Sequence, residues 1–286
     1  MAAAQDLSKL IPSDAKIEKL ASGLQFVEGP AWMRDGFLIF SDIPANKMMK
    51  WSAKDGLGVF RDPSHNSNGN TLDAQGRLFT CETGTRRVSF TERDGTVKTL
   101  VDRYQEKKFN SPNDIVVKSD GTVWFTDPNY NIPKGEAQEQ EHLLVYRVEP
   151  QTKNISPVAG WDFDKPNGLC FSPDEKKLYI ADSGKPHHIR VFNVQSDGKL
   201  SGGDVFCVID RGVPDGFRCD EFGNLWSSAG DGVQIFSPDG KLIGKIPVPE
   251  SPANLCFGGD DGKTLYITAR HSIYRIQTNV HAAKAT

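Results

Sequence analysis

Short runs of apolar and β-branched residues alternate with polar turns along the whole chain, and one such arrangement recurs six times. Five of the six copies open on a polar residue, and every copy continues into a strand-forming run, turns at Asp-Gly or a close substitute, and returns in a second strand. The opening positions are Glu28, Asn68, Asn113, Asn167, Asp215 and, without a polar side chain, Ala253. They lie about 38 to 54 residues apart, which is the repeat length of a propeller blade.

The third copy shows the order of strands and turns within one predicted blade. A hairpin turn at Asp120-Gly121 separates two strand-forming runs, and two more runs follow. These four runs are Asp114–Lys118, Thr122–Thr126, His142–Val148 and Ile155–Ala159. Equivalent third strands are predicted in the other copies, so each copy predicts a four-stranded sheet.

The sixth copy stops after its third strand, and Ile17–Phe26 at the other end of the chain is the candidate for the missing one. Pairing there would close the ring and protect an exposed sheet edge. We therefore predict an all-β fold, a six-bladed β-propeller closed by an N-terminal strand, as a single domain over residues 1–286 with an ordered core of about 16–277. The segment Tyr130–Glu141 is predicted to be a surface loop over a binding face, and Asn279–Thr286 a frayed tail.

Composition narrows the function classes. The net charge is −3 and basic residues do not cluster, which argues against nucleic-acid binding. No apolar run reaches membrane-spanning length, and the first residues lack the pattern of a secretory signal. The five cysteines form no CxxC pair, so we expect buried free thiols and a cytoplasmic protein.

The inner strands of a propeller surround its axis, so the six opening residues are expected to be neighbours in space. Five of them carry side-chain oxygens and none is His or Cys, which suits a hard cation, Ca²⁺ first, with Mg²⁺, Mn²⁺ or Zn²⁺ as alternatives. The second strands end at the same mouth, on Asp42, Glu82, Asp127, Asp182, Ala229 and Ala269. These carboxylates would either orient the amides of the opening ring or hold the blades together.

Five phrases carry a resemblance to a known family: Glu28-Gly-Pro-Ala-Trp, Phe109-Asn-Ser-Pro-Asn-Asp114, Lys165-Pro-Asn-Gly-Leu169, Val213-Pro-Asp-Gly216 and Cys256-Phe-Gly-Gly259. In order and spacing they resemble the gluconolactonase/regucalcin (senescence marker protein) family, in its bacterial sugar-lactonase branch, from about Ile17 to Ile276. More distantly the chain is similar to diisopropylfluorophosphatase. The resemblance implies one catalytic divalent cation in the channel, held by Glu28, Asn113, Asn167 and Asp215. Ser111 stands where the vertebrate branch has an Arg that contacts sugar hydroxyls.

The resulting hypothesis is a metal-dependent hydrolase that opens a small-molecule sugar lactone. Glu28, Asn167 and Asp215 would hold the cation, and Asn113 would be a fourth ligand or contact the substrate through water. Asp215 would act as general base, with direct attack by its carboxylate as the alternative. Two other readings stay open: organophosphorus-ester hydrolysis at the same metal, and a non-catalytic calcium-binding or interaction propeller. His65, Tyr130, Trp161, His187 and His271 lie near predicted loops at the mouth, where they would contact a sugar or simply be surface residues.

Overall fold

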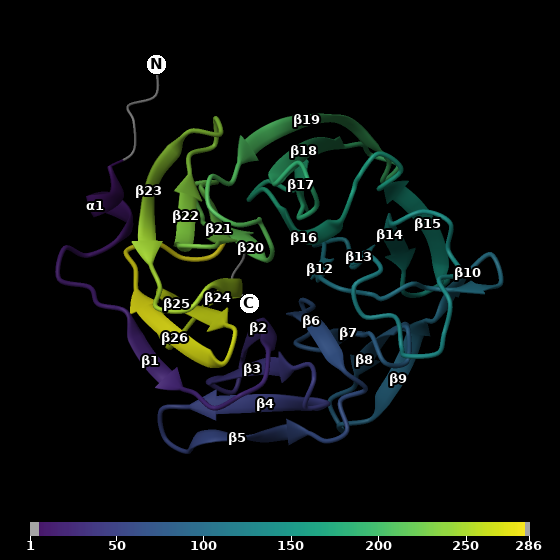
Figure 1. Cartoon of the computed structure of the whole chain (residues 1–286), viewed down its shortest axis with the longest axis horizontal. Coiled ribbons are helices and arrows are strands. Elements are labelled where there is room, and N and C mark those ends of the chain that lie inside the picture. Colours follow the sequence, from purple (N-terminus) through teal and green to yellow (C-terminus); the bar gives the residue numbers. More distant parts are fainter. Residues whose placement is uncertain (1–5, 284–286) are drawn as a thin grey trace.

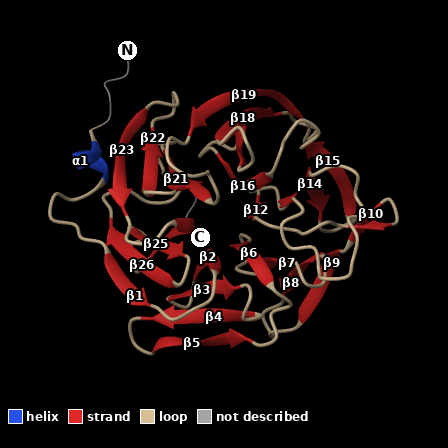
Figure 2. Cartoon of the chain, viewed as in Figure 1, coloured by secondary structure: helices blue, strands red, loops and turns tan. Residues whose placement is uncertain are grey.

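Six four-stranded antiparallel sheets follow one another around a central axis, as the sequence predicted (Figure 1). The computed structural model describes residues 6–283. Within that range strands and loops make up almost all of the molecule, and the helix α1 (Leu7–Leu10) lies outside the ring beside the fifth blade (Figure 2). The fold is therefore a six-bladed β-propeller.

In each blade the strands run in order from the axis outwards. Blades one to three consist of β2 (Val27–Met33), β3 (Phe37–Asp42), β4 (Lys47–Ser52) and β5 (Gly56–Arg61); β6 (Ser67–Leu72), β7 (Leu78–Glu82), β8 (Arg87–Thr91) and β9 (Val97–Val101); and β12 (Ile115–Val117), β13 (Val123–Asp127), β14 (Leu144–Glu149) and β15 (Asn154–Ala159). Blades four to six consist of β16 (Pro166–Phe171), β17 (Lys177–Asp182), β18 (His188–Val194) and β19 (Leu200–Val208); β20 (Phe217–Cys219), β21 (Leu225–Ala229), β22 (Gly232–Phe236) and β23 (Leu242–Pro247); and β24 (Pro252–Gly258), β25 (Thr264–Ala269), β26 (Ser272–Gln277) and β1 (Glu18–Ala21).

The last blade joins the two ends of the chain. Strand β1 pairs antiparallel with β26, with Glu18 opposite Arg275 and Ala21 opposite Ile273. This is the closure predicted for the segment Ile17–Phe26, although only four of its residues form the strand. Without β1 the main-chain groups along one side of β26 would face solvent as an unpaired edge.

The packed part of the chain is longer at both ends than expected. Leu10 is buried in the core between blades five and six, and Asn279 donates its backbone N–H to the Leu10 carbonyl at 2.9 Å. Val280 is buried beside them, and Ala283 donates to the Cys219 carbonyl. The prediction of a frayed tail is therefore wrong for residues 279–283, because Val280 finds an apolar pocket and the backbone finds partners. The remaining residues of that prediction, 284–286, lie outside the described part of the chain.

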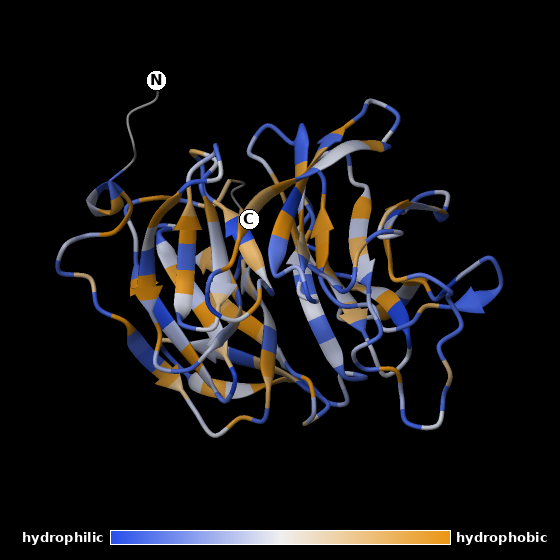
Figure 3. Cartoon of the chain, turned by 45° about the horizontal axis from the view of Figure 1, so that its top comes forward, coloured by the Kyte–Doolittle hydropathy of each residue, from blue (hydrophilic) through white to orange (hydrophobic). Residues whose placement is uncertain are grey.

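The core consists of six apolar clusters, each between two consecutive blades, in the described part of the chain. Trp124 and Ile180 join blades three and four, for example, and Phe40 and Tyr266 join blades one and six. Hydrophobic and hydrophilic bands alternate along the strands accordingly (Figure 3). All five cysteines are free and buried, as predicted.

Two details of the blades place the opening residues. The hairpin turn at Gly121 has φ +85°, a conformation that costs little only without a Cβ, so the first two strands return to the same mouth. At that mouth the register between first and second strands shifts, between Glu28 and Ala31, Ser67 and Asn70, Pro166 and Leu169, and Pro252 and Asn254. In blades three and five the first strand begins after the opening residue. An irregular ladder changes the direction in which side chains point. The opening residues therefore depart from the alternation between the two faces of the sheet that the rest of the strand follows.

The predicted loop at Tyr130–Glu141 is present between β13 and β14 and is attached to the ring. Arg86 is fully buried beneath it. Its Nε–H group donates to the Phe109 carbonyl at 2.5 Å, and its Nη1–H group donates to the Glu136 carboxylate at 2.9 Å. Lys108 in the small hairpin of β10 (Arg103–Tyr104) and β11 (Lys107–Lys108) donates its backbone N–H to Glu139. The sequence did not predict this hairpin.

Truncation tests the closure of the ring. A chain that begins at Gly23 lacks β1 and Leu10, so we expect a lower thermal midpoint and aggregation through the exposed edge of β26. A chain that begins at Asp6 is the matched control and should behave as the full chain does. Thermal unfolding followed with light scattering measures both; an unchanged midpoint in the Gly23 chain would contradict the role of β1.

Candidate functional site

The opening residues form a ring around the axis because the inner strands of neighbouring blades touch. Gly69 donates its backbone N–H to the Asn113 carbonyl at 2.8 Å, and Gly216 donates to the Ala253 carbonyl at 2.7 Å. A Cβ at Gly168 would lie 2.0 Å from the Asp215 carbonyl oxygen, so only glycine permits that approach. The structure thus brings the predicted residues together at one mouth of the channel.

The side chains of the ring are withdrawn from solvent. Glu28, Asn68, Asn113 and Asn167 are each less than 8% exposed, and Asp215 is half-buried. The amide oxygens Oδ1 of Asn68 and Asn167 are buried and have no hydrogen-bond partner among the described residues. A buried acceptor without a partner is costly, and coordination of a cation would remove that cost.

Glu28 is the most strongly perturbed carboxyl group of the ring. Its Oε2 atom accepts a hydrogen bond from Asn254 Nδ2 at 2.9 Å and another from the Gly29 backbone. Burial raises its pKa well above the usual range, and the negative charges of Asp215 and Asp114 add to that rise, while the two donors oppose it. Protons or a cation must therefore compensate the charge in this site.

Asp215 shares this environment. Burial and the nearby Asp114 raise its pKa to about 7, against the effect of a hydrogen bond with Asn167. A carboxyl group with a pKa near neutral pH can exchange a proton under physiological conditions, which is what a general base requires.

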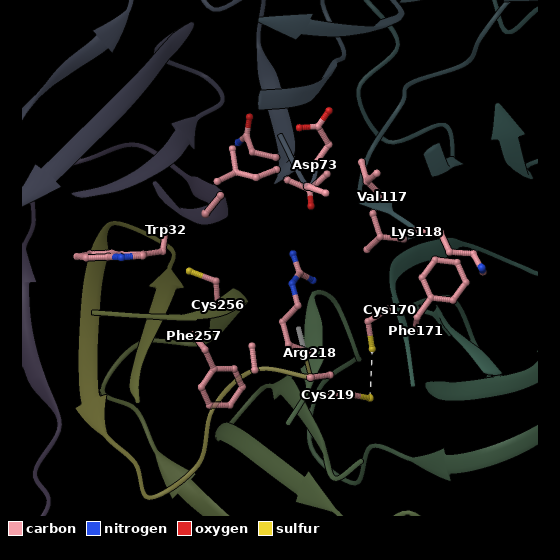
Figure 4. Close-up of a pocket in the computed structure, with 18 of the residues that line it drawn as sticks. Trp32, Asp73, Val117, Lys118, Cys170, Phe171, Arg218, Cys219, Cys256 and Phe257 are labelled. Atoms are coloured by element: carbon pink, nitrogen blue, oxygen red, sulfur yellow. Dashed lines mark hydrogen bonds between the residues drawn. The ribbon is translucent and has the colours of Figure 1, made fainter. Parts of the chain in front are cut away.

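Asp114 directly follows Asn113, is buried, and is close enough to Glu28 and Asp215 for its charge to raise their pKa values. Its Oδ2 atom is 3.6 Å from Nη1 of Arg218, which also donates to the Phe217 carbonyl at 2.7 Å. Beyond Arg218, at the opposite mouth, is a cavity of about 400 Å³ that the guanidinium group enters (Figure 4). Trp32, Phe171, Phe257, Cys170 and Cys256 give this cavity largely apolar walls. The two mouths therefore differ in chemistry, with the oxygen ligands at one and apolar side chains at the other.

The carboxylates that end the second strands hold loops rather than the opening ring. Asp42 accepts from the backbone of Gln25 and Phe26, Asp127 from that of Asn110 and Ser111, and Asp182 from that of Asp164 and Lys165. Glu82 instead binds side chains, including Arg87 Nε at 2.6 Å and Ser89 Oγ at 2.6 Å. Of the two roles left open by the sequence, the structure favours the one in which these acids hold the blades together.

Tyr130 is a loop residue whose hydroxyl interacts with the ring. Burial and the negative charge of Asp215 raise the pKa of its hydroxyl, which approaches Ser183 and Asn167. The Lys165 ammonium group lies 5.4 Å from the centre of the Tyr130 ring and donates to Asn129 Oδ1. Trp161 is 56% exposed. None of the hydrogen bonds in the described residues joins Trp161, His65, His187 or His271 to a side chain of the ring.

Sequence reasoning missed Asp114 and Asn254, which stand directly after opening residues. In four other blades glycine occupies that place, so the departure from the repeat was a usable signal. Ser111, in the place of the Arg of the vertebrate branch, is fully buried and its Oγ accepts from the Asn131 backbone at 3.1 Å.

The donor set suits a hard divalent cation. Two carboxylates and several amide oxygens are ligands that Ca²⁺ and Mg²⁺ prefer. In residues 6–283 no three His, Cys, Asp or Glu side chains gather as a metal-binding group, so any cation here depends on amide oxygens as well.

The amino-acid sequence matches a known protein family over most of its length. The family model described as SMP-30/Gluconolactonase/LRE-like region matches residues 26–271. The chain belongs to this family. It is 35% identical over 302 residues to the gluconolactonase of Zymomonas mobilis, covering 95% of this chain and 84% of that protein.

Members of the SMP-30/gluconolactonase family also share the fold. A solved gluconolactonase from Xanthomonas campestris has a TM-score of 0.89 at 36% identity, covering 95% of this chain and 92% of that chain. A calcium-binding protein, regucalcin, from Agrobacterium tumefaciens has a TM-score of 0.76 at 19% identity, covering 93% and 94%. The propeller and the predicted resemblance are thus confirmed. In the described part of the chain, no helix has the length and apolar character needed to cross a membrane.

The raised pKa of Asp215 predicts how pH affects the cation-free protein. Its carboxyl group keeps its proton up to a pKa of about 7 in the folded state but loses it near pH 4 when unfolded. Between these values the folded state binds more protons, so its stability falls as pH rises. In chelator, we expect the thermal midpoint to decrease from pH 5 to pH 8, and by less in Asp215→Asn.

Burial also raises the pKa of Asp127 to about 7, so Asp127 adds a pH dependence of the same sign. Only the difference between the parent and Asp215→Asn therefore reports on Asp215.

Binding of a cation would displace the protons, so Ca²⁺ affinity measured by calorimetry should rise with pH up to about 7. A midpoint that fell equally in parent and Asp215→Asn would contradict the assignment to Asp215.

Proposed function

We propose that this protein is a metal-dependent lactonase that opens a sugar lactone of the gluconolactone type. The single observation that supports this most directly is the ring itself. The buried carboxyl group of Glu28 and the half-buried one of Asp215 share it with two buried amide oxygens, Asn68 Oδ1 and Asn167 Oδ1, that have no partner among the described residues. Membership of the SMP-30/gluconolactonase family, with the gluconolactonases of Zymomonas mobilis and Xanthomonas campestris among its relatives, supports a lactone as the substrate.

Glu28, Asn167 and Asp215 would hold the cation, Ca²⁺ being the first candidate, and Asn113 would be a fourth ligand or contact the substrate through water. When bound, a divalent cation supplies a Lewis acid that polarises the lactone carbonyl and favours deprotonation of water. Glu28 contributes negative charge from a fixed position, because Asn254 and Gly29 both donate to its Oε2 atom. The Asn167 side chain is near enough to Asp215 to lower its pKa, and the Asn167 Oδ1 atom is buried without a partner among the described residues.

Asp215 is the candidate for the proton transfer. It is the more exposed of the two carboxyl groups, and once the cation has displaced its proton the carboxylate is ionised and can accept one from water. Water would lose a proton to the Asp215 carboxylate as it attacks the carbonyl carbon. The ring C–O bond then breaks, and the proton passes to the alkoxide oxygen that leaves.

The substrate would enter beside Tyr130 and Lys165. These residues and Asn129 offer hydroxyl, ammonium and amide groups, which can donate to sugar hydroxyls. The Arg218–Asp114 pair lies between this ring and the largely apolar cavity at the other mouth. The polar surface that faces the candidate ligands therefore favours a polyhydroxylated lactone.

Removal and return of the cation test the proposed function. Chelator-stripped protein should not release protons from glucono-δ-lactone above the spontaneous rate, and Ca²⁺, Mg²⁺, Mn²⁺ or Zn²⁺ should restore turnover. The restoring ion identifies the usable cation. Inactivity of folded, cation-loaded protein on a panel of sugar lactones would refute the proposal. Phosphotriester turnover in the same assay would then support an organophosphorus-ester hydrolase, and cation binding without turnover a binding propeller.

Substitution of Asp215 tests its role separately. We expect Asp215→Asn to lower kcat by at least about a hundredfold, because a positioned base contributes roughly that much. Asp42→Asn is the matched control, since Asp42 is a buried carboxylate at the same mouth that binds only loop backbone. It should lower the thermal midpoint and leave kcat close to that of the parent. A near-normal rate in Asp215→Asn would overturn the assignment.

A further inference from the structure

The sixth blade departs from the repeat at two adjacent positions. Its opening residue is Ala253, which offers no side-chain oxygen, whereas the other five blades present Glu, Asn or Asp. Its next residue is Asn254, where four other blades have glycine, namely Gly29, Gly69, Gly168 and Gly216. The blade that supplies no ligand thus carries an amide where a close backbone contact usually requires glycine.

The amide of Asn254 is held in one orientation. Its Oδ1 atom accepts the Leu255 backbone N–H at 2.8 Å, so its Nδ2 atom must face the other way, toward Glu28 Oε2 at 2.9 Å. The side chain is 1% exposed, and the Asn254 carbonyl accepts from Thr268 Oγ1 at 3.2 Å. Because the atom that faces Glu28 is the amide nitrogen, Asn254 serves Glu28 as a donor.

The neighbouring blade makes room for this amide. A Cβ on Gly216 would lie 1.9 Å from Asn254 Cγ and 2.0 Å from its Oδ1 atom. The residue after Asp215 must therefore be glycine for Asn254 to reach Glu28. Asn254 is packed between the segments that carry the two carboxyl groups of the ring.

Both hydrogen bonds that Glu28 receives go to the same oxygen. Asn254 and the Gly29 backbone donate to Oε2, whereas no hydrogen bond within the described part of the chain reaches Oε1. Donors on one oxygen fix the rotation of a carboxylate and leave the other oxygen free to bind. Groups behind a metal ligand commonly act in this way.

We propose that Asn254 is a positioning residue, which holds Glu28 through Oε2 so that Oε1 faces the cation. This proposal rests on the metal site of the proposed function and extends it to the sixth blade, whose opening residue Ala253 has no side-chain oxygen. Asn254 touches neither the cation nor the substrate, so its effect should appear first in cation affinity.

Calorimetric titration of the chelator-stripped full chain with Ca²⁺ tests this role. Asn254→Ala removes the donor, and we expect a dissociation constant about tenfold higher, the usual cost of losing a partner behind a ligand. Asn254→Gly is the second variant, since glycine occupies this place in four other blades and is compatible with the fold. It should show the same loss, so a folding defect in one variant does not end the test.

Asn224→Ala is the matched control. Asn224 is also a fully buried amide, and its Nδ2 atom donates to the buried Asp220 at 2.7 Å. It lies in the turn between β20 and β21, after Cys219, which lines the apolar cavity at the other mouth. Its loss should lower the thermal midpoint in chelator but leave the Ca²⁺ dissociation constant unchanged. The midpoint increase on adding Ca²⁺ should be smaller in the Asn254 variants than in Asn224→Ala.

The outcomes separate this proposal from the one it rests on. If the parent protein bound no divalent cation, the metal site would fail and the role of Asn254 with it. If the parent bound Ca²⁺ and both Asn254 variants bound it equally well, only the positioning role would be refuted. Equal weakening in Asn254→Ala and Asn224→Ala would also refute it, because the effect would then follow from general destabilisation.

Discussion

The arrangement of this protein depends on how closely the inner strands approach one another around the axis. At Gly69 and Gly216, backbone hydrogen bonds join neighbouring blades. At Gly168 the backbone lies so close to the Asp215 carbonyl oxygen that a Cβ atom would not fit. If the strands stood farther apart, the six opening residues could not share one small space. The six apolar clusters between blades stabilise the same arrangement from farther out.

That close approach has an electrostatic cost. It places Glu28, Asp215 and Asp114 within reach of each other's charge and away from water, and each has a raised pKa. Arg218 compensates Asp114 from the channel side, and amide donors compensate Glu28 in part. The remaining excess of negative charge lies where a divalent cation would stabilise it, so the burial that strains the carboxyl groups also prepares the site.

The sequence was most informative where the repeat is regular. Six copies, Asp-Gly turns and a missing last strand were enough to predict six blades and the closure by the segment Ile17–Phe26. The opening ring followed from the same symmetry. The hydrogen bond between Asn254 and Glu28 was out of reach, because it joins residues 226 positions apart and depends on the register shift after Pro252. The tail was misjudged for a similar reason, since Val280 packs in a cluster that joins Leu10 to side chains of blades five and six.

The last blade has a consequence for the order in which the molecule is built. Glu28 is among the first residues of the fold to leave the ribosome, yet Asn254, which holds it, is among the last. Strand β1 likewise waits for β26, which ends at Gln277. A nascent chain can form its early blades, but Glu28 lacks its Asn254 partner until the sixth blade has been made. A cation site built around Glu28 would therefore be completed only when that blade folds.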